Sequence, residues 1–380
     1  KRSAAEPSQP DNGVCVRPAM LPGEETVLYR TTAPAARPGS TPPGSVLVPA
    51  QRCCVMTNGE PLIEIHNLTV EVGAGKGRKV HAVSDVSFQM TKGETLGLVG
   101  ESGCGKSSIA RAIIQLPRPT SGKVFFRGED LTRIDSRRLR QLRPRFQMIF
   151  QDSIAALNPR RKVGETIAMP LNIIRNVRHS DRVSMAREMM TSVGLDPEMH
   201  HLRPFQFSGG QCQRIQIARA LMTKPELLIC DEPVSSLDVS IQAQIINLLE
   251  NLRMRYGLTM LFISHDMAVV KNICDRVAVM YLGKLCETAP TEDLYRMPTH
   301  PYTAALISAI PSRSTDRPAE KRGVKNPEIP SPINPPAGCR FHTRCPGAKT
   351  LCAESEPILQ DTGQGRQVAC HFPLQGTSTQ

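Results

Sequence analysis

Apolar and polar positions alternate along two segments near the start of the patterned part of the chain. Residues 62–70 and 83–90 carry an apolar side chain at about every second position, which is typical of half-buried β-strands. Three short apolar runs, residues 95–99, 226–230 and 258–263, resemble strands that are buried on both faces of a sheet. The sequence therefore predicts two kinds of strand, of which only the second kind is fully enclosed.

Helical patterns separate the enclosed strands. Residues 107–115 and 241–256 read as helices, and most of the segment 151–202 also reads as helical. Strands that alternate with helices predict an α/β fold with a mainly parallel sheet, and the two alternating strands predict an attached antiparallel β portion.

The two ends of the chain have a different character. Residues 1–55 are rich in Pro, Ala, Gly, Ser and Thr and show no periodicity, so we expect a disordered extension that ends near Met56. After Ile310 the proline density rises, which predicts an extended connector to a group of cysteines near the end of the chain.

Composition narrows the classes of protein that fit. The chain has 380 residues, a net charge of +12 and only 4% aromatic residues, with no Trp. The charge favours an anionic partner such as phosphates, nucleic acid or a membrane face, and the few aromatics argue against a base-stacking platform. The longest apolar runs are far shorter than the roughly 20 residues of a membrane-spanning helix, and the N-terminus lacks the apolar segment of a signal peptide.

A glycine-rich loop follows the run 95–99. Residues 100–107 read G-E-S-G-C-G-K-S and match the phosphate-loop pattern G-x-x-x-x-G-K-[ST] between a strand and a helix. The glycines let backbone N–H groups turn toward phosphates, and the helix N-terminus adds the positive end of its dipole. Lys106 is expected to reach the β- and γ-phosphates of ATP, and the Ser107 hydroxyl to bind Mg²⁺. The expected nucleotide-binding residues of this loop are Gly100, Ser102, Gly103, Cys104, Gly105, Lys106, Ser107 and Ser108.

Two carboxylates follow the apolar run 226–230. Ligands of parallel α/β sheets bind at the carboxyl ends of the strands, where Asp231 and Glu232 stand. We expect Asp231 to hold Mg²⁺, through water, and Glu232 to orient or deprotonate the water that attacks ATP.

Four further motifs resemble those of ABC-type ATPases. Residues 207–211 (F-S-G-G-Q) are similar to the signature motif, and residues 235–238 (S-S-L-D) to the D-loop. Gln151 resembles the Q-loop glutamine, and His265 the switch histidine. Singly, Gln151 could be a surface residue and His265 a core histidine. Six motifs in the family's order identify the chain as similar to the ABC-type P-loop NTPases.

The resemblance implies a fold and a mechanism. The fold would be a mixed sheet core with an antiparallel β portion and a helical subdomain, here residues 56–295. Two ATPase domains would bind ATP between them, with Ser208, Gly210 and Gln211 facing the γ-phosphate held by the partner. His265 would contact that phosphate, and Asp238 would lie nearby. Gln151 would contact Mg²⁺ and the attacking water and couple the helical subdomain to a membrane partner, so Glu232, His265 and Gln151 are the expected catalytic residues.

Two positions depart from the family pattern. The adenine of ATP usually stacks on an aromatic side chain of the β portion, but none lies between residues 65 and 88, where Val72 and His81 are the nearest candidates. Cys212 follows the signature where a charged or polar residue is usual, and we interpret it as a neutral replacement rather than a redox switch.

The tail narrows the family. Residues 299–306, 308–311 and 338–346 resemble the C-terminal region of oligopeptide and dipeptide importer ATPases, which here spans residues 296–380. The resemblance implies a peripheral subunit at the cytoplasmic face of the membrane. Its partners would be two transmembrane permease subunits, an extracytoplasmic peptide-binding protein and a second ATPase subunit, with a heterodimer favoured and no nucleic acid.

Four cysteines of the tail have the spacing C-x₅-C-x₆-C-x₁₇-C, and His342 and His371 stand nearby as spare ligands. Disulfides are improbable in a reducing cytosol, whereas four thiolates can enclose a [4Fe–4S] cluster or Zn²⁺. Similar importer ATPases carry a cluster here, so an iron–sulfur site is expected, with zinc and free thiols as the alternatives. The expected ligands are Cys339, Cys345, Cys352 and Cys370.

Other functions remain open. Six arginines between residues 133 and 145 could suggest nucleic acid, although a solvated helix face is the commoner explanation. A soluble ABC ATPase of DNA repair or translation usually carries two such domains or long insertions, whereas this chain has one phosphate loop and one signature. An importer of nickel or another small solute is a further alternative.

Overall fold

The computed structural model describes residues 59–75, 77–172, 177–310, 324–326 and 328–374. These residues all belong to one compact unit, Cys54–Gln380. The expected disordered extension, residues 1–55, lies outside the described residues.

The main sheet has eight strands in the order β11-β12-β10-β9-β3-β8-β7-β6. Neighbouring strands from β9 to β6 are parallel, and the strands from β9 to β11 are antiparallel. The bounds are β3 Thr95–Val99, β6 Phe146–Ile149, β7 Leu227–Asp231, β8 Thr259–Ser264, β9 Arg276–Tyr281, β10 Lys284–Pro290, β11 Gln360–Gly363 and β12 Arg366–Val368. The predicted parallel core is confirmed, and an antiparallel edge makes the sheet mixed.

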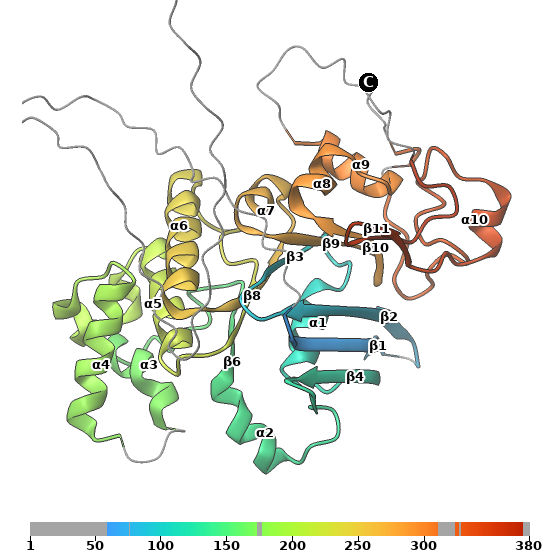
Figure 1. Cartoon of the computed structure of the whole chain (residues 1–380). Helices are drawn as coiled ribbons and strands as arrows, with labels where there is room; N and C mark the ends of the chain where they lie inside the picture. The colour runs from blue at the N-terminus through green and yellow to red at the C-terminus, as the bar shows by residue number, and fades with distance from the viewer. Residues whose placement is uncertain (1–58, 76, 173–176, 311–323, 327, 375–380) are drawn as a thin grey trace, which may run out of the picture. The chain divides into compact units, whose positions relative to one another are not determined.

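A second, antiparallel sheet has the order β2-β1-β4-β5. Its strands are β1 Pro61–Gly73, β2 Lys79–Thr91, β4 Ser121–Phe126 and β5 Glu129–Asp130. The alternating pattern of residues 62–70 and 83–90 lies in β1 and β2, which pair along most of their length. Figure 1 shows this sheet beside α1, on the far side of α1 from the helices of the middle of the chain.

Ten α-helices connect or flank the described strands. Their bounds are α1 Lys106–Ile113, α2 Ser136–Leu142, α3 Val163–Ala168, α4 His179–Ser192, α5 Gly209–Leu221, α6 Val239–Tyr256, α7 Met267–Ile273, α8 Thr291–Arg296, α9 Pro301–Ser308 and α10 Thr350–Glu354. Short 3₁₀ helices span Arg143–Arg145, Met169–Asn172, Pro197–His201 and Pro204–Gln206. In Figure 1, α3, α4 and α5 form a helical group at one side. Helices α3 and α4 lie within residues 151–202, which the sequence pattern predicted to be mostly helical, whereas α5 follows that segment.

The core lies on both faces of the main sheet, because successive side chains of a strand point to opposite faces. In β8, Met260 and Phe262 join the cluster beneath the later helices, whereas Leu261 and Ile263 join the cluster that includes α1 and the small sheet. Every residue of β3, β7 and β8 is buried. The predominantly apolar runs in the sequence are thus explained by coverage of the strands on both faces.

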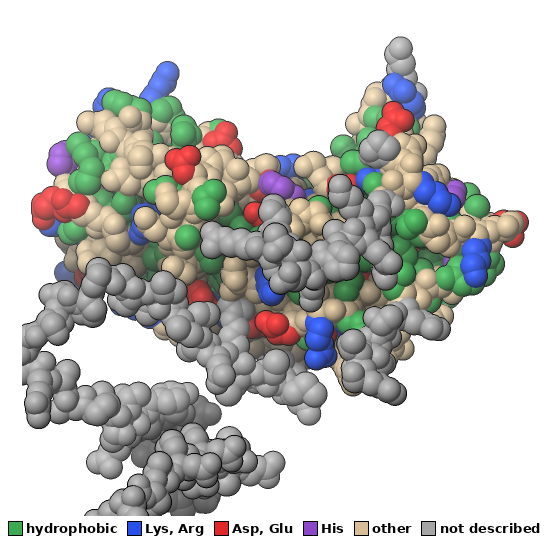
Figure 2. Space-filling model, turned by 90° about the horizontal axis from the view of Figure 1, so that it is seen from above, with side chains coloured by type: hydrophobic (Ala, Val, Ile, Leu, Met, Phe, Trp, Pro, Cys, Tyr) green, Lys and Arg blue, Asp and Glu red, His purple; other side chains and the backbone are tan. Residues whose placement is uncertain are grey.

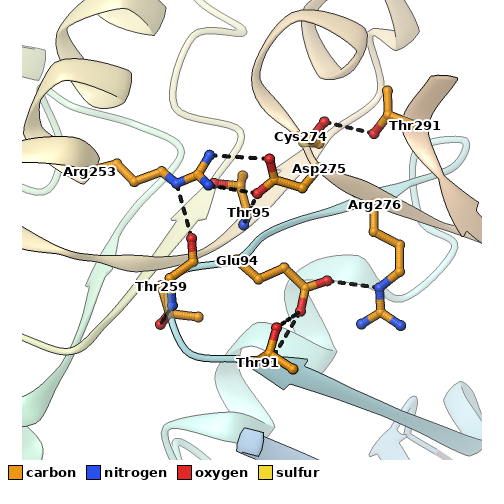
Figure 3. Close-up of polar contacts among 10 residues, drawn as sticks. Thr91, Glu94, Thr95, Arg253, Thr259, Cys274, Asp275, Arg276 and Thr291 are labelled. Carbon is orange, nitrogen blue, oxygen red and sulfur yellow. Dashed lines mark hydrogen bonds and ion pairs between the residues drawn. The ribbon is translucent and has the colours of Figure 1, made fainter. Parts of the chain in front are cut away.

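A polar network braces the edge at which the parallel strands begin (Figure 3). The Glu94 carboxylate accepts a hydrogen bond from Arg276 Nε at 2.8 Å. The Asp275 carboxylate accepts from the Thr95 backbone N–H at 2.8 Å and pairs with Arg253 of α6 at 2.8 Å. These contacts fix the starts of β3 and β9 relative to α6, and the candidate site lies at the opposite ends of the strands.

The tail extends the main sheet. β12 pairs antiparallel with β10, at Glu287↔Val368 and Thr288↔Gln367, and β11 follows at the edge. No helix in the described part of the chain is long and apolar enough to cross a bilayer.

Candidate functional site

The phosphate loop connects β3 to α1, as its sequence pattern predicts. Lys106 is the first residue of α1 and is only 4% exposed. Its ammonium group donates to the carbonyl oxygens of Gly100 at 2.8 Å and Glu101 at 3.0 Å, and it lies 3.7 Å from Cys104 Sγ. Ser102 and Gly103 are exposed at the tip of the loop. The loop therefore curls around the lysine with its tip open to solvent.

Two glycines show why the loop needs this residue type. Gly103 has φ +78°, which L side chains rarely adopt, and a Cβ there would meet nothing within 4 Å. Gly105 has φ +106°, and a Cβ there would stand 2.0 Å from the carbonyl oxygen of Ala82. Gly103 thus supplies the turn, and Gly105 lets the loop approach the backbone of β2.

Ser107 and Asp231 meet across 124 residues of sequence. The Ser107 hydroxyl donates to Asp231 Oδ1 at 2.9 Å. Asp231 ends β7 and is 3% exposed. Burial raises the pKa of Asp231, and the hydrogen bond from Ser107 acts in the opposite direction. A hydroxyl and a carboxylate side by side offer the hard oxygen ligands that Mg²⁺ prefers, so these residues fit the expected ion.

Glu232 brings the other two expected catalytic residues together. Gln151 Nε2 donates to Glu232 Oε2 at 2.9 Å, and His265 Nδ1 lies 3.4 Å from Glu232 Oε1. The backbone of Glu232 has φ +47°, an uncommon conformation for a residue other than glycine. Its N–H donates to the carbonyl oxygen of Ile263 in β8 at 3.0 Å, which holds the carboxylate at the end of the sheet.

The signature residues lie in a different environment. Ser208 caps α5: its hydroxyl accepts from the Gln211 backbone N–H at 3.3 Å, and the Gln211 side chain accepts from the Ser208 N–H at 2.9 Å. A Cβ on Gly210 would stand 2.7 Å from Ile241 of α6. Asp238 is exposed at the start of α6. The expected site therefore falls into two parts, with Ser208, Gly210 and Gln211 on the helical group.

Both departures from the family pattern can be located. Val72 is exposed at the end of β1, and His81 Nδ1 lies 3.4 Å from Glu71 Oε1 in β1. Cys212 is 2% exposed, its thiol faces the carbonyl oxygen of Pro204 at 3.6 Å, and burial raises its pKa.

Sequence reasoning missed a set of contacts between the tail and the phosphate loop. The Arg344 guanidinium donates to both carboxylate oxygens of Glu101, at 2.6 Å and 2.9 Å. The Glu101 backbone N–H donates to the Tyr302 hydroxyl at 3.0 Å. Arg344 and Tyr302 lie in segments that stand out in the sequence only by their resemblance to oligopeptide importer ATPases. No pattern in the sequence points from them to residue 101.

The four tail cysteines line one cavity of about 270 Å³, together with His342 and His371. All four thiols are free, and burial raises the pKa of Cys339 and of Cys370 to about 11. Within the described part of the chain, no three His, Cys, Asp or Glu side chains are grouped closely enough to hold a metal ion. The structure thus brings the predicted ligands to one cavity but does not support a metal-binding tail by itself.

Three of the six arginines in the basic run form ion pairs with neighbouring acids. Arg138 pairs with Glu129 at 2.8 Å, Arg145 with Glu226 at 2.5 Å and Arg133 with Asp130 at 3.5 Å. The ion pairs favour the solvated-face interpretation of these arginines. Figure 2 shows the face that is seen from above, away from α2, and on that face Lys and Arg side chains are scattered among acidic ones.

Both the ATPase segment and the tail of this chain match known protein families. Residues 83–235 match the family described as ABC transporter, and residues 286–352 match the family described as oligopeptide/dipeptide transporter, C-terminal region. The oligopeptide transport ATP-binding protein AppF of Bacillus subtilis (strain 168) is 50% identical over 295 residues, covering 77% of this chain and 90% of AppF. The chain belongs to the family of ABC-type oligopeptide transport ATP-binding proteins. OppF of Salmonella typhimurium, also named an oligopeptide transport ATP-binding protein, is 48% identical over 316 residues, covering 80% of this chain and 95% of OppF.

Solved structures agree with this family. The dimeric post-hydrolysis structure of the ATP-binding cassette MJ0796, bound to ADP and Pi, has a TM-score of 0.56 and 27% identity. It covers 60% of this chain and 98% of its own. As a member of this family the protein is an ATPase, so the fold and activity expected from the six motifs are confirmed. The soluble ABC ATPases of DNA repair and translation are not favoured.

Proposed function

We propose that the protein hydrolyses ATP at the site around Lys106, Asp231 and Glu232 and thereby drives uptake of di- or oligopeptides through a membrane importer. The observation that carries this proposal is the convergence of motif residues that are far apart in sequence. Gln151 and His265 both contact the Glu232 carboxylate, and Ser107 contacts the adjacent Asp231. Family membership and the tail match support the peptide as cargo.

The phosphate loop would bind the phosphates of ATP. Lys106 now donates to two loop carbonyls and would turn to the β- and γ-phosphates, while exposed loop N–H groups supply further donors. Ser107 and Asp231 would hold Mg²⁺, which neutralises charge that develops on the phosphates. The buried Asp231 carboxylate would gain a compensating cation in this way.

Glu232 would act on the attacking water. A carboxylate held between Gln151 and His265 can accept the water's proton as the water oxygen bonds to the γ-phosphorus. The bond from the γ-phosphorus to the bridging oxygen then breaks, and ADP and phosphate leave. Gln151 belongs to the segment between the sheet and the helical group, so its contact with Glu232 can link catalysis to movement of those helices.

The signature residues would act on a partner's nucleotide. Ser208, Gly210 and Gln211 lie at the start of α5, where the first N–H groups have no acceptor within the helix and the positive end of the helix dipole favours an anion. We propose that they face ATP bound by a second ATPase subunit, which is a paralogue rather than an identical chain. Two permease subunits and an extracytoplasmic peptide-binding protein would complete the importer, with this subunit peripheral at the cytoplasmic face.

The substitution Glu232→Gln tests the catalytic assignment. In the complex purified with its native partners, this variant should bind ATP but release phosphate roughly 10²–10⁴-fold more slowly, the usual contribution of a general base. Asp361→Asn, on an exposed strand of the tail, is the matched control. Wild-type phosphate release from Glu232→Gln would refute the role of Glu232. A complex with nucleic acid in place of permeases would refute the importer.

We also propose that Cys339, Cys345, Cys352 and Cys370 hold a [4Fe–4S] cluster. Their common cavity and their thiol chemistry support the proposal. The cluster would supply cross-links between tail segments, since ATP hydrolysis needs no electron transfer.

Anaerobic purification tests the cluster. The protein should be brown, absorb near roughly 400 nm and contain iron and sulfide, and Cys352→Ser should lose the colour. Cys212→Ser, which removes a thiol outside the cavity, should keep it. A colourless protein that holds one zinc ion, or no metal, would refute the proposal.

A further inference from the structure

Glu101, the second residue of the phosphate loop, forms a hydrogen bond at each of its polar groups. The Glu101 carboxylate accepts two hydrogen bonds from Arg344, its N–H donates to Tyr302, and its carbonyl oxygen accepts from Lys106 at 3.0 Å. Two of these three partners come from the tail, which lies outside the segment that matches ABC transporters in general.

We infer that Arg344 and Tyr302 are positioning residues of the ATP site, which hold Glu101 so that the phosphate loop keeps its binding conformation. The inference rests on the proposal that residues 100–107 bind the phosphates of ATP. It adds that the tail of this chain is part of the nucleotide site.

Arg344 is built as a rigid support. Its side chain is 5% exposed, and its Nε donates to the carbonyl oxygen of Asn326 at 3.0 Å. The guanidinium lies over the rings of Tyr281 and Phe341, 5.6 Å and 5.9 Å from their centres. Cation–π contacts with two rings and a bidentate pair leave such an arginine little freedom.

Tyr302 belongs to the same group. Its ring packs against Tyr281 and Phe341, with centres 4.8 Å and 5.2 Å apart, and it is 1% exposed. Phe341 and Arg344 come from the cysteine-containing segment, Tyr302 is the second residue of α9, and Tyr281 is the last residue of β9. Three separate parts of the chain therefore meet beneath Glu101.

The pair also controls charge beside the phosphates. Glu101 adds a negative charge to a loop whose ligand is an anion, and its carboxylate is only 26% exposed. An unpaired carboxylate there would repel the phosphates, because the repulsion between two like charges is weakly screened in a partly buried site. Arg344 neutralises this charge and directs the carboxylate toward the tail.

Ordering a loop before binding mainly affects affinity, because the loop's conformational entropy is lost whenever ATP binds. Loss of the support should therefore raise the KM for ATP more than it lowers kcat. Catalytic contacts of Glu232, Gln151 and His265 lie elsewhere and should persist once ATP saturates the site.

The test compares Arg344→Met with Arg366→Met. Arg366 is another buried arginine of the tail, but it donates to the carbonyl oxygens of Asp293 and Met297 and not to the loop. For Arg344→Met we expect the Kd for ATP, titrated on the full chain, to rise about tenfold, within the usual range of coupling between sites. In the assembled transporter, KM should rise similarly while kcat stays within about threefold. Arg366→Met should lower the unfolding temperature without changing KM.

Two further variants separate the effect of the unpaired Glu101 charge from an effect on folding. Arg344→Lys should restore part of the affinity, because an ammonium group pairs with one carboxylate oxygen but not both. Glu101→Gln should reduce the effect of Arg344→Met, because the double variant leaves no unpaired carboxylate. If Arg344→Met fails to fold, Arg344→Lys and Glu101→Gln are compared instead, with raised KM expected for both.

The substitution Lys106→Ala distinguishes a failure of the positioning role from a failure of the phosphate-loop assignment. If Lys106→Ala abolishes ATP binding while the Arg344 and Glu101 variants bind ATP as the wild type does, the positioning role is refuted and the phosphate loop stands. If Lys106→Ala binds ATP normally, the phosphate-loop assignment itself is wrong. A fall in kcat with unchanged KM would also overturn the inference.

Discussion

The attachment of the tail should weaken in acid, because α9 is capped by a buried histidine. His300 is 2% exposed, and its Nδ1 accepts the backbone N–H of Tyr302 at 3.0 Å. Burial lowers the pKa of His300 from 6.5 to about 4. Protonation would place a charge in the core and would remove the lone pair that caps the helix.

The sign and size of the effect follow from linkage. Between pH 6.5 and about 4 the unfolded chain binds a proton at this residue and the folded chain does not, so the free energy of unfolding falls as pH falls. The full shift corresponds to about 3 kcal/mol, of which about 2 kcal/mol is lost between pH 7 and pH 5.

The substitution His300→Asn isolates this contribution. Asparagine is a good N-cap residue and can accept the same N–H, but it does not titrate. Urea unfolding of both proteins at pH 7, 6 and 5 should show the wild type losing about 2 kcal/mol more than the variant. The lost ring contact with Phe341, at 5.9 Å between centres, lowers the variant's stability equally at every pH.

Other acid-sensitive groups are common to both proteins and cancel in the difference. Parallel pH dependences for wild type and His300→Asn would mean that His300 ionises as easily in the folded chain as in the unfolded one. That result would refute the reasoning from burial and capping.

Two further predictions concern the nucleotide site. Asp231→Asn keeps an acceptor for the Ser107 hydroxyl and removes a carboxylate whose pKa burial raises, so its free energy of unfolding without nucleotide should be unchanged or higher. Mg²⁺-dependent phosphate release should nevertheless fall by roughly 10³-fold, and an active variant would contradict the Mg²⁺ role. Gly105→Ala should cost about 2 kcal/mol or more in urea unfolding, because its Cβ would collide with the Ala82 carbonyl at 2.0 Å. Gly103→Ala, with open space at the same loop, should cost less, and equal costs would refute the steric argument.

Sequence patterns predicted the strands that are buried most uniformly. Residues 95–99 and 258–263 correspond to β3 and β8. Both faces of these strands are covered, so the runs are almost entirely apolar, and their polar residues, Thr95 and Thr259, are themselves buried. The edge strands β11 and β12 were not predicted. β11 is exposed throughout and β12 has only three residues, so neither carries a hydrophobic pattern long enough to recognise.

The candidate site was predictable where chemistry is tied to a motif. Gln151, Glu232 and His265 were each named from their motifs, and the contacts among them follow from the order of the parallel strands β6, β7 and β8. Arg344 was not predictable in this way. Its partner is 243 residues away, and its importance depends on how the tail folds back rather than on any local spacing.

The tail and the ATPase core are joined by the ion pair between Arg344 and Glu101 of the phosphate loop. On the proposed assignment of residues 100–107 to the phosphates of ATP, the loop would hold its shape before ATP arrives, and it would place Glu101 where an unpaired charge opposes the ligand. The Arg344 guanidinium both holds the Glu101 carboxylate in place and neutralises its charge. An arginine that is 5% exposed is costly unless paired, so Glu101 equally holds the tail in register. The same ion pair would therefore couple the conformation of the cysteine-containing segment to that of the phosphate loop. A substitution in either segment should alter the conformation of the other.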